Sequence, residues 1–142
     1  MAAVKGTIVK CEKLMSSDWF GKSDPYVVVT VLSATGDAKG EMKTSVKNNC
    51  NDPSWDDEPF SFSGVDQDCA LRFFVCDSDF GKDDLLGEAV LPVKLIPVDD
   101  PEIPGPDTVF TLALGLKKGK SMGTITVNLG LVPPTRWFEG GI

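Results

Sequence analysis

Aspartate residues are concentrated in two short segments of the sequence, where their side chains could bind a metal ion. Segments 16–26 and 76–88 hold six of them: Asp18 and Asp24 in the first, and Asp77, Asp79, Asp83 and Asp84 in the second. Two carboxylates about 5 Å apart repel by roughly 3 kcal/mol at an effective dielectric constant of about 20, so a cluster needs a cation. Oxygen donors without nitrogen or sulfur select calcium, which takes about 6–8 oxygens.

Two other interpretations use the same residues. Aspartate is common in turns, but six aspartates at two junctions of the same kind argue against simple turn formation. An EF-hand starting at Asp77 would place Asp79, Asp83 and Glu88 at ligand positions. However, its glycine, Gly81, comes one position too early, and the flanking segments have the pattern of strands, not helices. We therefore reject the EF-hand.

The composition excludes several classes of function. The chain has 142 residues and no histidine, which excludes Ser-His-Asp and Cys-His catalysis and His-ligated zinc, and we expect no enzymatic activity. The net charge is −7, from 21 acidic and 14 basic residues. Such a charge disfavours binding to nucleic acid, and also to an anionic membrane unless a cation reverses the charge locally.

The cysteines and the N-terminus indicate a reducing compartment. None of Cys11, Cys50, Cys69 and Cys76 forms a Cys-x-x-Cys pair, and the opening MAAVKGTIV has no signal-peptide pattern. We therefore expect a cytoplasmic protein whose cysteines are small, reduced core residues. No apolar run reaches the roughly 18 residues of a membrane span, so any contact with a membrane would be peripheral.

Alternating hydrophobic residues, interrupted by turn residues, predict an all-β fold. The clearest strand is 123–129, in which Ile125, Val127 and Leu129 face one way. The other expected strands are 6–11, 25–32, 42–47, 59–62, 70–76, 87–93 and 108–114. The prolines of 97–107 exclude a helix or a central strand there. We predict one domain, an eight-stranded antiparallel β-sandwich.

Three motifs occur in the order of a known family. The first is Asp18, five residues, and then Asp24-Pro25-Tyr26-Val27; the second is Asp52-Pro53-Ser54-Trp55 followed by three acids; the third is Asp77-Ser78-Asp79 and then Asp84-Leu85-Leu86-Gly87-Glu88. The chain resembles C2 domains, the calcium-dependent phospholipid-binding modules of protein kinase C, synaptotagmins and cytosolic phospholipase A2. The resemblance implies a Greek-key sandwich over residues 1–132 and a C-terminal tail over 133–142. A single strand before the first acidic segment resembles the type II topology of the family.

The resemblance also implies a ligand set. The calcium ligands would be Asp18, Asp24, Asp77, Asp79 and Asp84, together with main-chain carbonyls near Ser17 and Ser78. Asn49 could add an amide oxygen or could be a plain turn residue. The loop of the third motif, which begins at Asp77, is one residue shorter than the commonest form in the family, so we expect two calcium ions and not a third. Asp83 could substitute as a ligand, but we expect it to face solvent.

Aromatic and basic residues near the aspartates predict the membrane contact. Trp19, Phe20 and Phe80 follow ligand aspartates and would insert into the bilayer, whereas without the resemblance they would fold back under their loops. Lys22, Lys82, Lys43 and Lys47 are candidates for headgroup contact. Lys43 and Lys47 share one face of an expected strand, but Glu41 dilutes their charge, and an ordinary solvated face is the better interpretation of these two. Trp55 would pack structurally.

These expectations combine into a calcium switch. We predict a monomeric, non-enzymatic module that docks on anionic phospholipid membranes when calcium rises, with roles in signalling and membrane trafficking. The alternative is a C2-type scaffold for protein–protein interaction in which calcium is structural or dispensable. Neither the protein partner nor the lipid preference follows from the sequence.

Overall fold

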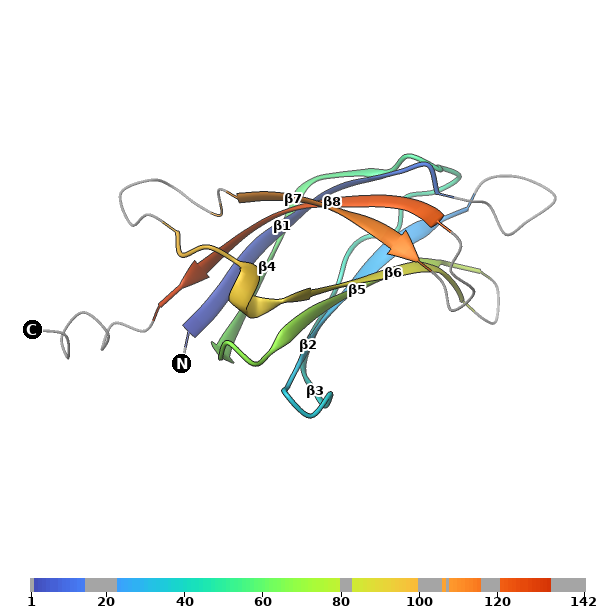
Figure 1. Cartoon of the computed structure of the whole chain (residues 1–142). Coiled ribbons are helices and arrows are strands. Elements are labelled where there is room, and N and C mark those ends of the chain that lie inside the picture. Colours follow the sequence, from blue (N-terminus) through green and yellow to red (C-terminus); the bar gives the residue numbers. More distant parts are fainter. Residues whose placement is uncertain are drawn as a thin grey trace, which may run out of the picture.

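The computed structural model describes residues 2–14, 23–79, 83–99, 106, 108–115 and 121–133, apart from the side chains of 121 and 122. It contains eight strands and one short 3-10 helix (Figure 1). The elements are β1 (Ala2–Glu12), β2 (Pro25–Leu32), β3 (Ala38–Lys43), β4 (Ser54–Val65), β5 (Ala70–Asp77), β6 (Asp84–Pro92), η1 (Val93–Leu95), β7 (Thr108–Gly115) and β8 (Ser121–Val132). The all-β antiparallel prediction is confirmed.

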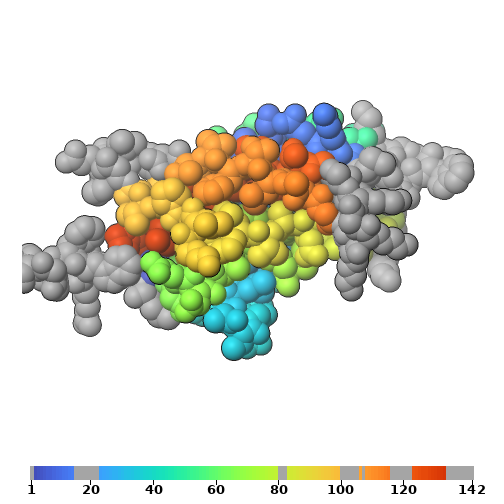
Figure 2. All heavy atoms as spheres, in the orientation of Figure 1, coloured from blue at the N-terminus to red at the C-terminus, as the bar shows by residue number. Residues whose placement is uncertain are grey.

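The strands form two layers. They are hydrogen-bonded in the order β3-β2-β5-β6-β7-β8-β1-β4. Among the described residues, β6 and β7 share a single register pair, Glu88 with Gly115, so the order divides there into two four-stranded layers (Figure 1). Side chains of β6 and β7 close the space between the layers on the face in Figure 2.

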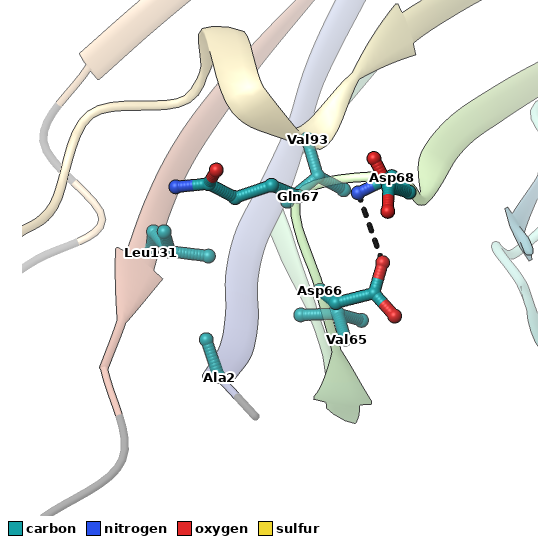
Figure 3. Close-up of a pocket in the computed structure, with 7 residues that line it drawn as sticks. All are labelled: Ala2, Val65, Asp66, Gln67, Asp68, Val93 and Leu131. Carbon is teal, nitrogen blue, oxygen red and sulfur yellow. Dashed lines mark hydrogen bonds between the residues drawn. The ribbon is translucent and has the colours of Figure 1, made fainter. Parts of the chain in front are cut away.

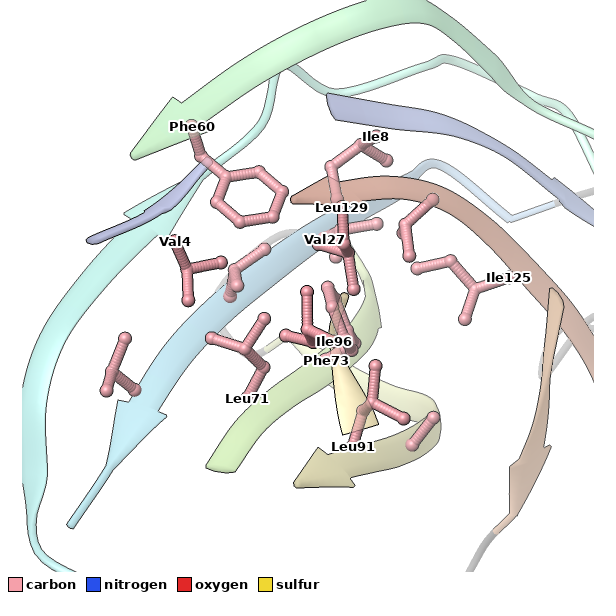
Figure 4. Packing of buried hydrophobic residues seen from close by; sticks show 14 of the residues in the cluster. Val4, Ile8, Val27, Phe60, Leu71, Phe73, Leu91, Ile96, Ile125 and Leu129 are labelled. Atoms are coloured by element: carbon pink, nitrogen blue, oxygen red, sulfur yellow. The ribbon is translucent and has the colours of Figure 1, made fainter. Parts of the chain in front are cut away.

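The core lies between the two layers and follows the alternation of the strands. In β8, Ile125, Val127 and Leu129 are fully buried, as predicted. In β5, every second residue is buried, and Phe73 packs edge-on against Phe60 of β4 with ring centroids 6.5 Å apart (Figure 4). Fully burying one such side chain contributes roughly 1.5–3 kcal/mol to folding, so the core fixes the register of the strands.

The third strand differs from the sequence prediction. It covers Ala38–Lys43 instead of 42–47. At Thr44 the regular ladder with β2 ends, because the Thr44 hydroxyl accepts a hydrogen bond from the backbone N–H of Val27 at 2.9 Å. Lys47 lies beyond the strand, and its N–H donates to the Pro25 carbonyl at 2.9 Å. The prediction that Lys43 and Lys47 share a strand face is therefore wrong.

The cysteines are less uniform than expected. All four are free thiols, but only Cys11 and Cys69 are buried, while Cys50 and Cys76 are half-buried. The prediction of core residues is thus correct for two of the four. Burial raises the pKa of the Cys11 thiol far above its ordinary value, because the thiolate would have no solvation there.

The chain order places a single strand before the first acidic segment. β1 precedes residues 15–22, and β8 pairs with β1 along most of its length. Within the described ranges, no helix is long and apolar enough to cross a membrane.

Candidate metal centre

The register of three adjacent strands brings aspartates from distant parts of the sequence together. Pro25, at the start of β2, lies opposite Asp77 at the end of β5, and Asp77 lies opposite Asp84 at the start of β6. Asp24 directly precedes Pro25, and Asp79 follows two residues after Asp77. The pairing therefore places Asp24, Asp77 and Asp84 at the same end of one layer.

Hydrogen bonds to backbone groups fix two of these aspartates. Asp77 is only 2% exposed, and its Oδ1 accepts the backbone N–H of Asp24 at 2.8 Å. In return, the N–H of Ser78 donates to the carbonyl of Asp24 at 2.9 Å. These two bonds hold the start of β2 to the end of β5, because they continue the strand pairing one residue beyond the ladder.

Asn49 joins this group through its backbone. Its N–H donates to Oδ1 of Asp24 at 2.6 Å, and its φ of 54° lies in the left-handed region that asparagine tolerates better than most residues. This observation supports the turn role that the sequence left open for Asn49. The amide-ligand role stays a prediction.

Asp18 and the rest of residues 15–22 lie outside the described residues, but the residues on either side are placed. The N–H of Leu14 donates to the carbonyl of Asn51 at 3.0 Å, and the N–H of Cys50 donates to the carbonyl of Ser23 at 2.8 Å. Leu14 and Ser23 are therefore both bonded to the turn that contains Cys50 and Asn51.

Asp83 has a role that the sequence did not indicate. One carboxylate oxygen accepts the hydroxyl of Tyr26 at 2.5 Å, and the other accepts the backbone N–H of Asp79 at 3.1 Å. The Tyr26 hydrogen bond is the main reason that the pKa of Asp83 is lowered. Burial, followed by the contact with Asp83, raises the pKa of Tyr26. Asp83 is exposed, as expected, but its carboxylate is occupied by this pair of bonds.

The basic candidates occupy different surroundings. Lys43 places its ammonium 4.2 Å from the centre of the Tyr26 ring, a cation–π contact. Sequence reasoning missed Tyr26, although its place in the Asp-Pro-Tyr-Val motif, two residues after Asp24, was the signal available. Ser17, Asp18, Trp19, Phe20, Lys22, Phe80 and Lys82 lie outside the described residues.

The donor chemistry fits calcium, while the described geometry is incomplete. The donors near Asp77 are carboxylate, carbonyl and hydroxyl oxygens, and among the described residues the buried hydroxyl of Ser23 has no hydrogen-bond partner. Among the residues that the structure describes, no three His, Cys, Asp or Glu side chains converge closely enough to hold a metal ion. Completing a site therefore requires Asp18 or a rearrangement of the described carboxylates.

Two other features lie outside this group. Trp55 is 4% exposed and donates its indole N–H to the carbonyl of Ser45 at 2.8 Å, which confirms its predicted structural role. The pocket in Figure 3, of about 330 Å³, is lined by residues that include Ala2, Val65 and Leu131. Ala2 begins β1, Val65 ends β4 and Leu131 lies near the end of β8, so the pocket is separate from Asp24, Asp77 and Asp84.

Comparison with known families identifies the fold. The family model described as "C2 domain" matches residues 3–106. The chain belongs to the C2 domain family. C2 domains are typically non-catalytic binding modules, and those of the synaptotagmin type generally bind calcium and phospholipid.

Relatives of this C2 domain differ widely in length. Protein C2-DOMAIN ABA-RELATED 11 of Arabidopsis thaliana is 36% identical over 62% of this chain and 49% of its own length. A Rho GTPase-activating protein of Dictyostelium discoideum is 32% identical over 70% of this chain and 16% of its own. Human synaptotagmin-7 is 31% identical over 63% of this chain and 22% of its own length. The chain thus spans less than half of these relatives.

Solved structures agree with the assignment. The C2A domain of a plant extended synaptotagmin 1 superimposes with a TM-score of 0.79 and 30% identity, covering 94% of this chain and 96% of that domain. A human GIVD cytosolic phospholipase A2 superimposes with a TM-score of 0.68 over 94% of this chain and 17% of its own. At 18% identity, the second likeness supports the fold alone.

Proposed function

We propose that this C2 domain binds calcium and then docks on phospholipid membranes. The observation that carries the proposal is the β2–β5–β6 register, which sets Asp24, Asp77 and Asp84 at one end of a layer. The second support is that Leu14 and Ser23, on either side of segment 15–22, both bond to the turn at Cys50 and Asn51, and in this proposal Asp18 joins the same end.

The ligands in this proposal are the five aspartates of the two acidic segments. Main-chain carbonyls near Ser17 and Ser78, and the amide of Asn49, would add oxygens. Bound calcium would supply positive charge and open coordination positions for headgroup phosphates. Two ions would add four positive charges to an end that otherwise repels anionic lipid, which makes the cluster an electrostatic switch.

The aromatic residues of the loops would provide the apolar contact. In this proposal Trp19, Phe20 and Phe80 enter the bilayer, while Lys22 and Lys82 remain at the headgroups. Lys43 and Lys47 are secondary headgroup candidates, since Lys43 already contacts Tyr26. Association would be peripheral, by a monomeric cytoplasmic protein when calcium rises, with its place in signalling or trafficking set by the parent protein.

Liposome co-sedimentation tests the proposal. The chain should sediment with vesicles containing phosphatidylserine in calcium, remain in the supernatant with EGTA, and respond much less to magnesium, which requires a smaller octahedral shell. Vesicles of phosphatidylcholine alone provide the neutral comparison. Equal sedimentation with and without calcium would contradict the switch.

The aromatic contact has its own test. A variant that keeps Trp19 as its sole tryptophan, with Trp55→Phe and Trp137→Phe, should show a blue shift of fluorescence with calcium and vesicles together. Trp19→Ala combined with Phe80→Ala should reduce docking at saturating calcium at least tenfold, or about 1.4 kcal/mol. Docking without any spectral shift would mean that headgroup coordination alone carries the binding.

A protein-interaction scaffold is the second candidate. The observation that favours it is the absence, among the described carboxylates, of a group already arranged for a metal ion. This candidate predicts sedimentation that does not depend on calcium, with an effect of calcium on stability only where the ion is structural. The same vesicle experiment therefore separates the two functions.

A further inference from the structure

The carboxylate of Asp83 connects two structural elements through its two oxygens. Oδ2 accepts the Tyr26 hydroxyl of β2 at 2.5 Å, and Oδ1 accepts the backbone N–H of Asp79 at 3.1 Å. Asp79 lies four residues earlier, after the end of β5, so the second bond links Asp79 to the residue that precedes β6. Through Asp83, Asp79 is thereby connected to Tyr26 of β2.

Tyr26 is well placed to serve as an anchor. It is only 6% exposed, and its ring is covered by the Lys43 ammonium at 4.2 Å. Cys76 of β5 is its register partner across the sheet and contacts its hydroxyl end. A buried phenol held on two sides loses little freedom when it donates its hydrogen bond, so its hydroxyl is a fixed point for a loop residue.

We propose that Tyr26 and Asp83 form a bridge that positions Asp79 for calcium binding, and that Asp83 is a positioning residue and not a ligand. This proposal rests on the calcium site proposed above. A bridge of this kind arranges the loop before the ion arrives, so less ordering opposes binding. It also accounts for Asp83 keeping a charge beside the site without adding to the coordination shell.

The competing assignment makes Asp83 a direct ligand. As a ligand, Asp83 would have to direct its remaining lone pairs at calcium while its two oxygens also accept the hydroxyl of Tyr26 and the N–H of Asp79. Bonds to a charged acceptor are among the stronger hydrogen bonds in proteins, so these two bonds hold the carboxylate of Asp83 in one orientation. The two assignments differ in what loss of the Tyr26 hydroxyl does, because a ligand does not need that hydroxyl.

Calorimetric titration of the full chain with calcium chloride distinguishes them. Tyr26→Phe removes the hydroxyl alone and should weaken calcium binding about 3- to 10-fold. Asp83→Ala should weaken it by a similar factor, and the double variant should be no weaker than Asp83→Ala, because both changes break the same bridge. Thr111→Val, which removes a hydroxyl on β7, is the matched control and should bind like the unmodified chain.

Amide hydrogen exchange provides a readout without metal. In the calcium-free chain, the N–H of Asp79 should exchange several-fold faster in Tyr26→Phe and in Asp83→Ala than in Thr111→Val, while the β5 amides stay protected. Unchanged exchange at Asp79 in Tyr26→Phe would overturn the bridge. So would additive losses in the double variant, or a large loss in Asp83→Ala with none in Tyr26→Phe, which would make Asp83 a ligand. If the unmodified chain binds no calcium, the proposed function fails, whereas the exchange experiment still decides whether the bridge exists.

Discussion

At the scale of single residues, the acidic end is ordered by backbone donors. Asp77 accepts the N–H of Asp24, and Asp24 accepts the N–H of Asn49, so each negative charge is held by a neutral donor from another segment. Sequence motifs predicted that Asp24, Asp77 and Asp84 share this end. They could not predict the Tyr26–Asp83 contact, because that contact depends on which way two side chains turn after β2, β5 and β6 have paired.

Asp77→Asn removes the negative charge of this side chain while nearly preserving its shape. The amide oxygen of asparagine can still accept the Asp24 N–H, so the fold should be retained, and stability without calcium should rise slightly as one repulsive charge disappears. Calcium affinity should fall at least tenfold, about 1.4 kcal/mol, in calorimetric titration. Asp56→Asn is the control: Asp56 has a left-handed φ of 50°, which asparagine tolerates, and lies outside the proposed ligand set. Equal calcium affinity in both variants would reject Asp77 as a ligand.

The four thiols should react at different rates. Cys11 is 1% exposed and burial raises its pKa, while Cys69 is 2% exposed. Cys50 and Cys76 are half-buried, and burial raises the pKa of Cys76 as well. Because the thiolate is the reactive form, iodoacetamide at about pH 8 should modify Cys50 first, Cys76 more slowly, and the other two only after unfolding. Peptide mass spectrometry over time measures this order, with urea-unfolded protein as the reference. Early modification of Cys11 in the native chain would contradict the packing of β1.

At the scale of the strands, the alternation of hydrophobic residues correctly predicted the strands and faces that pack into the core. β2 covers the expected residues 25–32, and β8 buries the expected face. The errors occur where pairing, not alternation, sets the boundary. β3 begins at Ala38, because β2 supplies partners for residues whose own sequence has no strand pattern. β4 begins at Ser54 and includes Asp56 and Asp57, both with left-handed φ, an irregularity that local propensity does not indicate.

Gly6 tests how closely the side chains pack in the layer formed by β7, β8, β1 and β4. It lies in β1 between Phe60 of β4 and Leu129 of β8, and a Cβ at this position would overlap the Phe60 ring and lie 2.8 Å from Leu129. Phe60 is held by Phe62 and Phe73, so the ring has little room to move. Gly6→Ala should therefore destabilise the fold by about 1–3 kcal/mol, measured by urea denaturation. Gly115→Ala, where a Cβ meets nothing within 4 Å, should change stability much less. Similar free energies of unfolding for the two variants would show that Phe60 and Leu129 can move enough to accommodate the added methyl group.

At the scale of the whole molecule, the packed core of the sandwich and the acidic end that would bind ions are distinct regions. The net charge of −7 opposes approach to an anionic surface, and Asp24, Asp77 and Asp84 add to that repulsion at one end. The core is a cluster of buried apolar side chains, and none of the aspartates belongs to it. In the proposed function, calcium therefore acts on the electrostatics of the acidic end and not on the packing of the core.

Calcium should nevertheless raise the melting temperature. An ion that binds the folded chain and not the unfolded one stabilises it by about 2.7 kcal/mol at a hundred times its dissociation constant. For a domain of this size, that free energy corresponds to a rise of roughly 5–10 °C, visible by circular dichroism or calorimetry. Magnesium at the same concentration should shift the melting temperature much less. Asp77→Asn should melt at a similar or slightly higher temperature than the unmodified chain in EGTA but lose most of the calcium shift, since its fold is intact and its ligand is missing. A melting temperature of the unmodified chain that stays constant up to millimolar calcium would reject the metal site and favour the scaffold function.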